Sequence, residues 1–173
     1  MAYSPMTADL CDHYFTSPDR LKILEPNLLR GYGLKSSFHG KIETVSCFES
    51  NPIVRETLES PGMGRVLVVD AGSSKRCAVL GDQLAELAVQ NNWAGIVING
   101  FIRDSKVINE MDVGIKAIGT HPCKSSKKYQ GVRGCRCNFG GVEFVPGFWL
   151  YSDEDGIIVS EEELTMTNDS GAG

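Results

Sequence analysis

The segment 81–104 (GDQLAELAVQNNWAGIVINGFIRD) constrains the fold of this chain more than any other stretch. After Gly81-Asp82, apolar residues recur at intervals of three and four, as on the buried face of a helix. The run 95–99 (GIVIN) is then the continuous apolar sequence of a strand covered on both faces, and 65–70 (RVLVVD) is a second such strand before the helix. The pattern predicts buried strands with a helix packed against them.

The remaining sequence predicts shorter elements around this unit. Thr7 suits the N-cap of a first helix, and Gly140-Gly141 suits a hairpin turn with positive φ. Helix–strand alternation followed by hairpins predicts a single α/β domain over 1–173, with a mixed sheet layered with helices. The tail, 160–173, is expected to be partly disordered. Helices are expected at about 7–14, 52–60 and 105–111, and strands at about 40–48, 77–80, 114–118, 135–139, 142–145, 148–151 and 156–159.

Charge and composition narrow the choice of partners. The chain has 173 residues and a net charge of −5, with its acidic residues spread along the sequence. Nucleic acid is not expected as a partner, because phosphate binding requires a concentrated basic patch. Basic residues in one segment are interleaved with Ser and Gly, and we interpret them as a solvent-exposed loop: Lys124, Lys127, Lys128, Arg133 and Arg136.

Hydropathy gives no sign of a membrane or an export route. No apolar run approaches the roughly 20 residues of a membrane span, and the start MAYSPMTADLCDHYF lacks the basic and apolar regions of a signal peptide. A cytoplasmic location is therefore expected. The six cysteines are expected to be reduced thiols.

The start of the central helix is a candidate anion site. Gly81 allows a ligand to approach the backbone, and Asp82 is expected at the N-cap, where the amides of Gln83 and Leu84 would face outward. Free N–H groups and a partial positive charge at a helix N-terminus suit a small carboxylate or phosphate. The alternative is that Asp82 is only a structural cap.

Arg103-Asp104 follows the buried strand 95–99, at the carboxyl end where ligands of open α/β sheets usually bind. Arg103 can hold a carboxylate through two parallel charge-assisted hydrogen bonds. Asp104 supplies a hard oxygen ligand suited to Mg²⁺ or Mn²⁺. The alternative is an exposed ion pair at a strand end.

Other residue types in the sequence carry weaker signals. His121-x-Cys123 and Cys135-x-Cys137 differ from the Cys-x2-Cys spacing of zinc ribbons and fingers, and we interpret these cysteines as core thiols. No cysteine has a histidine at a position indicating a catalytic pair.

Several segments together resemble the family of ribonuclease activity regulator A and 4-hydroxy-4-methyl-2-oxoglutarate aldolase. The central signature is Asp82 followed by Arg103-Asp104, and the resemblance extends from about Thr7 to Glu163. Supporting segments are RVLVVDAG, LAVQNNWAGIVINGFIRD, DVGIKAIGTHP and FGGVEFVPGFWLYSDEDGIIVS.

The resemblance implies a β/β/α swivelling-type domain that assembles as a homotrimer with sites near subunit interfaces. It also implies a class II aldolase that uses a divalent metal, cleaves 4-hydroxy-4-methyl-2-oxoglutarate to pyruvate and decarboxylates oxaloacetate. By this resemblance, a 2-oxo acid would be held through its carboxylate by the backbone amides of Gly81, Asp82, Gln83 and Leu84. Arg103 would bind the same substrate. Asp104 would ligate the metal, and Asp82 would hold a water on it.

Two departures keep a second function open. Some aldolases of the family carry an acidic residue where this chain has Val107, and longer members add a C-terminal carboxylate that Glu161–Glu163 do not clearly match. The chain length and two segments are closer to the regulators, which inhibit ribonuclease E through protein contacts. Regulators tend to lack the acidic residue that this chain keeps as Asp104. A methyltransferase of menaquinone synthesis is disfavoured, because no Gly-rich adenosyl-binding loop follows a first strand.

Overall fold

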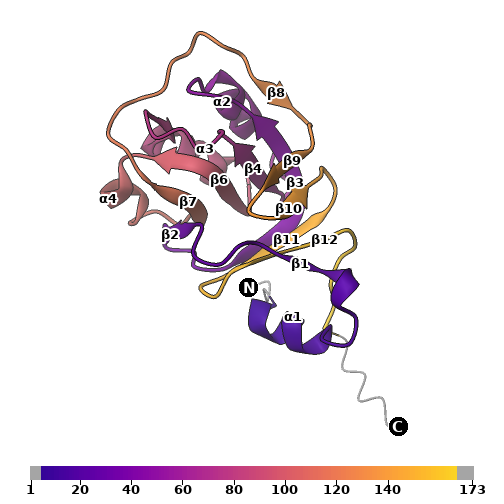
Figure 1. The fold of residues 1–173 in the computed structure, drawn as a ribbon. Coiled ribbons are helices and arrows are strands. Elements are labelled where there is room, and N and C mark those ends of the chain that lie inside the picture. Colours follow the sequence, from indigo (N-terminus) through magenta and orange to yellow (C-terminus); the bar gives the residue numbers. More distant parts are fainter. Residues whose placement is uncertain (1–4, 167–173) are drawn as a thin grey trace.

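Parallel strands form the centre of the molecule, shown in Figure 1. The computed structural model describes residues 5–166. The parallel strands lie side by side in the order β3 (Phe38–Ser46), β4 (Val66–Asp70), β6 (Gly95–Ile102) and β7 (Ile115–Thr120), and β5 (Ala78–Leu80) also pairs in parallel with β6.

Both faces of the central strands are buried, as their apolar sequences predict. Along β4, Leu67 and Val69 pack into the cluster that includes the helices, whereas Val66 and Val68 pack into a second cluster on the opposite face. All four side chains are fully buried. Successive side chains of a strand point to opposite faces, so a strand can be apolar throughout only where both faces are covered.

Helices cover one face of this sheet. They are α2 (Pro52–Glu59), α3 (Asp82–Gln90) and the short α4 (Ser105–Ile108). In α3, Leu84, Ala85 and Ala88 are buried and Leu87 is partly buried, in agreement with the helical spacing in the sequence. Asn91 follows α3, and its side-chain amide donates to the carbonyl of Leu58 at 2.9 Å, which ties α3 to the end of α2.

Antiparallel strands extend the sheet and cover its other face. Gly140 and Gly141 have φ values of 58° and 76° and close the predicted hairpin between β9 (Cys137–Phe139) and β10 (Val142–Phe144). The sheet continues from β3 through β11 (Trp149–Ser152) and β12 (Ile157–Ser160) to β1 (Lys22–Ile23). At its other edge β2 (Arg30–Tyr32) pairs with β7. The strand β8 (Val132–Arg133) pairs with β3, and the strands β9 and β10 pair with each other.

The first helix, α1 (Thr7–His13), lies at the opposite end of the molecule from α2 and is followed by a single 3₁₀ turn, η1 (Pro18–Arg20). The expected N-cap at Thr7 is wrong, because the N-cap is Met6 and its side chain makes no capping hydrogen bond. Thr7 instead donates to Asp153 from its backbone N–H at 2.7 Å and from its hydroxyl at 2.6 Å. Asp153 therefore fastens α1 to the sheet.

The most consequential difference from the sequence prediction is the length of β6, which continues beyond Asn99 to Ile102. The sequence predicted a strand that ends at Asn99, but Asn99 lies in the sheet opposite Asp70 and donates to its carboxylate at 3.0 Å. Among the described residues no helix is both long and apolar enough to cross a membrane. The predicted tail disorder concerns 160–173, of which 167–173 lie outside the described residues.

The hydrogen bonds to Asp153 predict that substitution of this buried residue lowers the stability of the protein. Asp153 is 2% exposed, so Asp153→Ala leaves the two buried Thr7 donors unsatisfied. We expect the free energy of unfolding to fall by about 2–3 kcal/mol, measured by urea denaturation at pH 7. The control is Asp155→Ala, at an exposed position whose backbone N–H contact to Asp153 is kept. Equal stability of the two variants would contradict this role.

The same contact predicts a pH dependence of stability. Burial alone raises the pKa of Asp153, but hydrogen bonds from Thr7, Asp155 and Gly156 outweigh it and hold the pKa below its ordinary value. A carboxyl whose folded pKa is lowered stabilises the protein above its unfolded pKa of about 3.9 and loses that contribution as the pH falls through the folded value. The stability difference between the wild type and Asp153→Ala should therefore narrow below about pH 4, which denaturation at several pH values measures.

Candidate functional site

The ends of two parallel strands bring the predicted site residues together. Leu80 of β5 lies in register with Ile102 of β6, and the N–H of Arg103 donates to the carbonyl of Leu80 at 2.9 Å. Gly81 and Arg103 are thus the first residues beyond two adjacent strand ends. This is the carboxyl edge of the parallel sheet, where ligands of α/β proteins usually bind.

Asp104 reaches across this edge to the start of α3. Its backbone adopts the left-handed conformation, with φ 60° and ψ 35°, and its Oδ2 accepts a hydrogen bond from the N–H of Asp82 at 3.1 Å. Gly81 makes this approach possible, because a Cβ at Gly81 would lie 2.7 Å from Asp104 Oδ2 and 3.5 Å from Nε of Arg103. The glycine, the guanidinium and the carboxylate therefore form one tightly packed group.

The expected role of Asp82 as N-cap is wrong. The N-cap is Gly81, in an extended conformation, and Asp82 is the first residue of α3. Asp104, just beyond β6, supplies the capping carboxylate, while Asp82 Oδ1 accepts from the N–H of Gln83 at 2.9 Å. Two of the amides expected to face a ligand, those of Asp82 and Gln83, thus donate to carboxylate oxygens in this structure, in agreement with the preference of helix N-termini for anionic groups. The Asp82 contact is with its own neighbour, and rotation of that side chain frees the Gln83 amide.

These residues line a cavity of about 280 Å³, to which four segments contribute. Gly81, Asp82, Gln83 and Leu84 come from the start of α3, and Arg103 and Asp104 from the end of β6. Five further lining residues were not predicted from the sequence, because they lie far away in the chain: Asn51, Arg55, Lys124, Ser125 and Lys127.

A parallel bridge between Ala78 and Lys124 brings the last of these segments to the site. The segment predicted to be a solvent-exposed loop therefore also contributes residues to the cavity. Lys124 and Lys127 are exposed, as expected, but they also line the cavity. Arg133 and Arg136 point elsewhere and pair with Glu43 and Glu143.

Arg103 differs from most arginines of the protein in its partners. Its side chain is partly buried and makes no hydrogen bond or ion pair with any residue in 5–166. A half-buried guanidinium that lines a cavity and has no carboxylate partner among the described residues is suited to bind an anion from solution. Six other arginines each pair with a glutamate: Arg20, Arg55, Arg65, Arg76, Arg133 and Arg136.

The oxygen donors of the site fit a hard divalent cation such as Mg²⁺. Asp104 is exposed, and only its Oδ2 accepts a hydrogen bond within the described chain, so Oδ1 can face a ligand. The carboxylate of Asp82 lies on the adjoining helix start. No cluster of three or more His, Cys, Asp or Glu suited to a metal occurs in residues 5–166. The donors at this site are carboxylate oxygens, whereas zinc sites usually include Cys or His. Mg²⁺ commonly keeps several waters and takes one or two protein carboxylates.

Val107, where some relatives are acidic, lies on α4 and is 49% exposed. It does not line the cavity.

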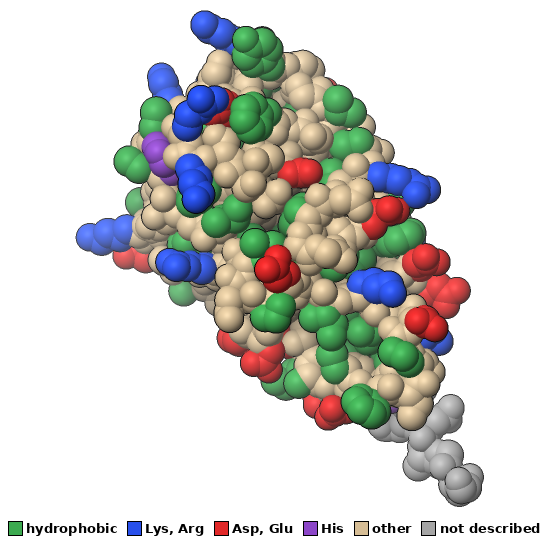
Figure 2. Space-filling view, in the orientation of Figure 1, with side chains coloured by type: hydrophobic (Ala, Val, Ile, Leu, Met, Phe, Trp, Pro, Cys, Tyr) green, Lys and Arg blue, Asp and Glu red, His purple; other side chains and the backbone are tan. Residues whose placement is uncertain are grey.

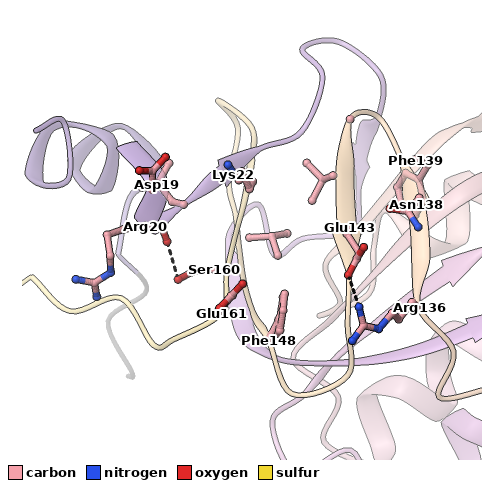
Figure 3. A pocket seen from close by; sticks show the side chains of 14 residues that line it. Asp19, Arg20, Lys22, Arg136, Asn138, Phe139, Glu143, Phe148, Ser160 and Glu161 are labelled. Carbon is pink, nitrogen blue, oxygen red and sulfur yellow. Dashed lines mark hydrogen bonds and ion pairs between the residues drawn. The ribbon is translucent and has the colours of Figure 1, made fainter. Parts of the chain in front are cut away.

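A larger cavity, of about 730 Å³, lies away from these residues, between β1, β12 and the β9–β10 hairpin (Figure 3). Arg136 in its wall pairs with Glu143 at 3.1 Å, and the hydroxyl of Ser160 donates to the carbonyl of Arg20. The polar groups that Figure 3 joins by dashed lines are thus already satisfied by one another. We favour the smaller cavity as the site, because its cations and carboxylates converge while Arg103 remains unpaired.

Two buried cysteines, Cys47 and Cys137, are poorly suited to form a second reactive centre. Burial, followed by the neighbouring Cys135, raises the pKa of Cys137 to about 12, and burial raises that of Cys47 to about 12. The thiolate is the nucleophile and the metal ligand, so such thiols are poorly suited to either role at neutral pH. His121 Nδ1 accepts a hydrogen bond from the N–H of Cys123 at 3.0 Å.

Charged side chains are mixed over the face of the molecule in Figure 2, where Lys and Arg are interspersed with acidic and hydrophobic residues. The cavity at the end of β6 differs in composition, since four cationic side chains and two carboxylates line it. Its excess of positive charge, in a chain with net charge −5, favours an anionic ligand.

This fold and this site define an α/β protein in which basic and carboxylate side chains line one cavity at the ends of adjacent parallel strands. The chain belongs to the RraA-like family, whose Aldolase/RraA model matches residues 7–159.

Relatives of the chain carry three kinds of function in their names. A protein of Aromatoleum aromaticum, provisionally named a 4-hydroxy-4-methyl-2-oxoglutarate aldolase, is 52% identical over 91% of this chain and 97% of its own length. A solved structure described as the RNA-processing inhibitor RraA from Thermus thermophilis is 36% identical with a TM-score of 0.88, over 96% of this chain and 98% of that one.

A third relative has a solved structure described as an S-adenosylmethionine:2-dimethylmenaquinone methyltransferase from Geobacillus kaustophilus HTA426. It is 46% identical with a TM-score of 0.86, and the match covers 92% of this chain and 97% of that chain. The likeness to solved structures agrees with the mixed α/β fold described above.

The contact at Gly81 predicts that a single methyl group disturbs the site. In Gly81→Ala the new Cβ would lie 2.7 Å from Asp104 Oδ2, so the carboxylate is displaced. We expect Mn²⁺ binding, measured by calorimetry, to weaken by at least about tenfold, the size that loss of ligand orientation produces. The control is Gly156→Ala, where a Cβ would meet nothing within 4 Å. Unchanged Mn²⁺ affinity in Gly81→Ala would show that the close packing does not position Asp104.

Proposed function

We propose that this protein is a divalent-metal-dependent class II aldolase that cleaves 4-hydroxy-4-methyl-2-oxoglutarate to pyruvate and also decarboxylates oxaloacetate. The observation that carries the proposal is the convergence of Arg103, Asp104 and the start of α3 in one small cavity. The name of the Aromatoleum relative supports the same activity. Both reactions break a carbon–carbon bond next to a 2-oxo acid, and both substrates are small anions.

The chain's own residues would divide the work of binding. The carboxylate next to the 2-oxo group would accept hydrogen bonds from Arg103 and from the first-turn amides of α3, taking the place that Asp82 Oδ1 occupies at Gln83 N–H. Gly81 leaves room for this approach. Two anchors on one carboxylate fix the orientation of the scissile bond relative to Asp104.

Asp104, with Asp82 beside it, would hold the Mg²⁺ or Mn²⁺ ion. When bound, the cation supplies Lewis-acid stabilisation of the negative charge that develops on the 2-oxo oxygen as the carbon–carbon bond breaks. Asp82 would accept the proton of the 4-hydroxyl group through a water during aldol cleavage. Decarboxylation of oxaloacetate needs no such proton acceptor, because carbon dioxide leaves instead of a carbonyl fragment.

A second candidate function is inhibition of a ribonuclease E-like enzyme through protein contacts, without catalysis. The structural likeness to the RNA-processing inhibitor from Thermus thermophilis favours it. A surface regulator has no use for the cation ligand Asp104 or for an unpaired Arg103 in a cavity, so the aldolase proposal accounts for more of the structure. In either case we propose a homotrimer, which sedimentation equilibrium measures.

The aldolase proposal predicts that pyruvate release from oxaloacetate depends on Mg²⁺ and on Asp104. We expect a rate well above that of free Mg²⁺, abolished by excess chelator, and reduced by at least about a hundredfold in Asp104→Asn, since a Lewis acid contributes several kcal/mol to the transition state. Asn keeps an oxygen that can accept from Asp82 N–H, so the start of α3 is preserved. Asp112→Asn, at an exposed position outside the cavity, is the control.

A wild-type rate equal to the metal-only background would overturn the proposal for oxaloacetate. Pull-down with a ribonuclease E-like protein would then test the regulator function.

A further inference from the structure

Residues of the segment 124–127 line the cavity, and backbone hydrogen bonds hold this segment in place. Ser126 N–H donates to the carbonyl of Glu49 at 2.8 Å, and Asn51 N–H donates to the carbonyl of Ser126 at 3.2 Å. The N–H of Ala78 donates to the carbonyl of Cys123 at 2.8 Å just before the segment. Side chains of this segment are therefore presented to the cavity from a fixed backbone.

Ser125 is the feature of this segment that no structural role explains. Ser125 is 7% exposed and lines the cavity, and its Oγ has no hydrogen-bond partner within residues 5–166. Buried hydroxyl groups in folded proteins are nearly always hydrogen-bonded, because leaving one unsatisfied costs free energy. An unpartnered hydroxyl in the wall of a ligand cavity is explained if the ligand supplies its partner.

The flanking charges indicate the chemistry of that partner. Lys124 and Lys127 line the cavity on either side of Ser125, and neither ammonium group forms an ion pair with a described residue. Arg55, a third cation in the same wall, is already paired with Glu59 at 3.7 Å. A hydroxyl donor and two ammonium groups without carboxylate partners, lining the same cavity, are suited to an anionic oxygen ligand.

We infer that Ser125, Lys124 and Lys127 form a second anion subsite, which binds the distal carboxylate of a dicarboxylic 2-oxo acid. The inference rests on the proposed function, in which Arg103 and the start of α3 hold the carboxylate next to the 2-oxo group. The residues of both subsites line one cavity of about 280 Å³, a size suited to a small diacid. Ser125, Lys124 and Lys127 thereby determine specificity for two carboxylates over one.

The test compares a dicarboxylate with a monocarboxylate in the same variants. Oxaloacetate carries both carboxylates, whereas pyruvate lacks the distal one and acts as a competitive product inhibitor. In Lys124→Ala/Lys127→Ala we expect KM for oxaloacetate to rise about tenfold, equivalent to about 1.4 kcal/mol, with the inhibition constant of pyruvate within about twofold of the wild type. Ser125→Ala should raise KM less and leave the melting temperature unchanged, because its hydroxyl has no partner to lose.

Lys128→Ala is the matched control, since Lys128 belongs to the same loop but does not line the cavity. Unchanged KM for oxaloacetate in the double variant, with an active wild type, would overturn the subsite and leave the aldolase proposal intact. Equal weakening of oxaloacetate and pyruvate would also overturn it, because the lysines would then act on the whole site. A wild type without metal-dependent turnover would overturn the proposed function, and the subsite for its substrate with it.

Discussion

The parallel pairing of β4 with β6 is the interaction on which the rest of the structure depends. Val66–Asp70 pairs residue by residue with Gly95–Asn99, and nearly every side chain of both segments is buried. Because neither face can meet water, one face requires the helices α2 and α3 and the other requires the hairpin and the antiparallel strands. The two apolar clusters are consequences of this double burial, and the fold follows from covering both sides of the same strands.

The site follows from the same pairing through the ends of the strands. Parallel strands end at a common edge, so residues about twenty positions apart in the chain become neighbours there. At this edge Gly81 and Asp104 pack so closely that a side chain on the former would collide with the latter. The carboxylate of Asp104 satisfies the first amide of α3, a function that the N-cap side chain usually performs. A contact between two loops thus replaces a local capping signal.

Sequence patterns predicted the buried strands, the central helix and the group formed by Gly81, Arg103 and Asp104, because each signal is local in the chain. Other features escaped prediction for physical reasons. The predicted strand ended at Asn99, yet Asn99 donates to Asp70 within the sheet and β6 continues to Ile102. Lys124 and Ser125 are brought to the cavity by contacts over more than forty residues, among them the bridge of Lys124 to Ala78 and the hydrogen bond of Ser126 to Glu49, which leave no periodic pattern. Family membership is confirmed by the model match over residues 7–159.

The position of Asp104 has a consequence for how ligands act on one another. Its carboxylate is held by the amide of Asp82, which belongs to the same helix start that faces the anion side of the cavity. In the proposed function, a cation on Asp104 would change the electrostatic potential at those amides, and an anion at the amides would change the potential at Asp104. Thermodynamic linkage requires the two effects on binding free energy to be equal. The helix start would therefore couple the affinities of two chemically opposite ligands without any movement of the sheet.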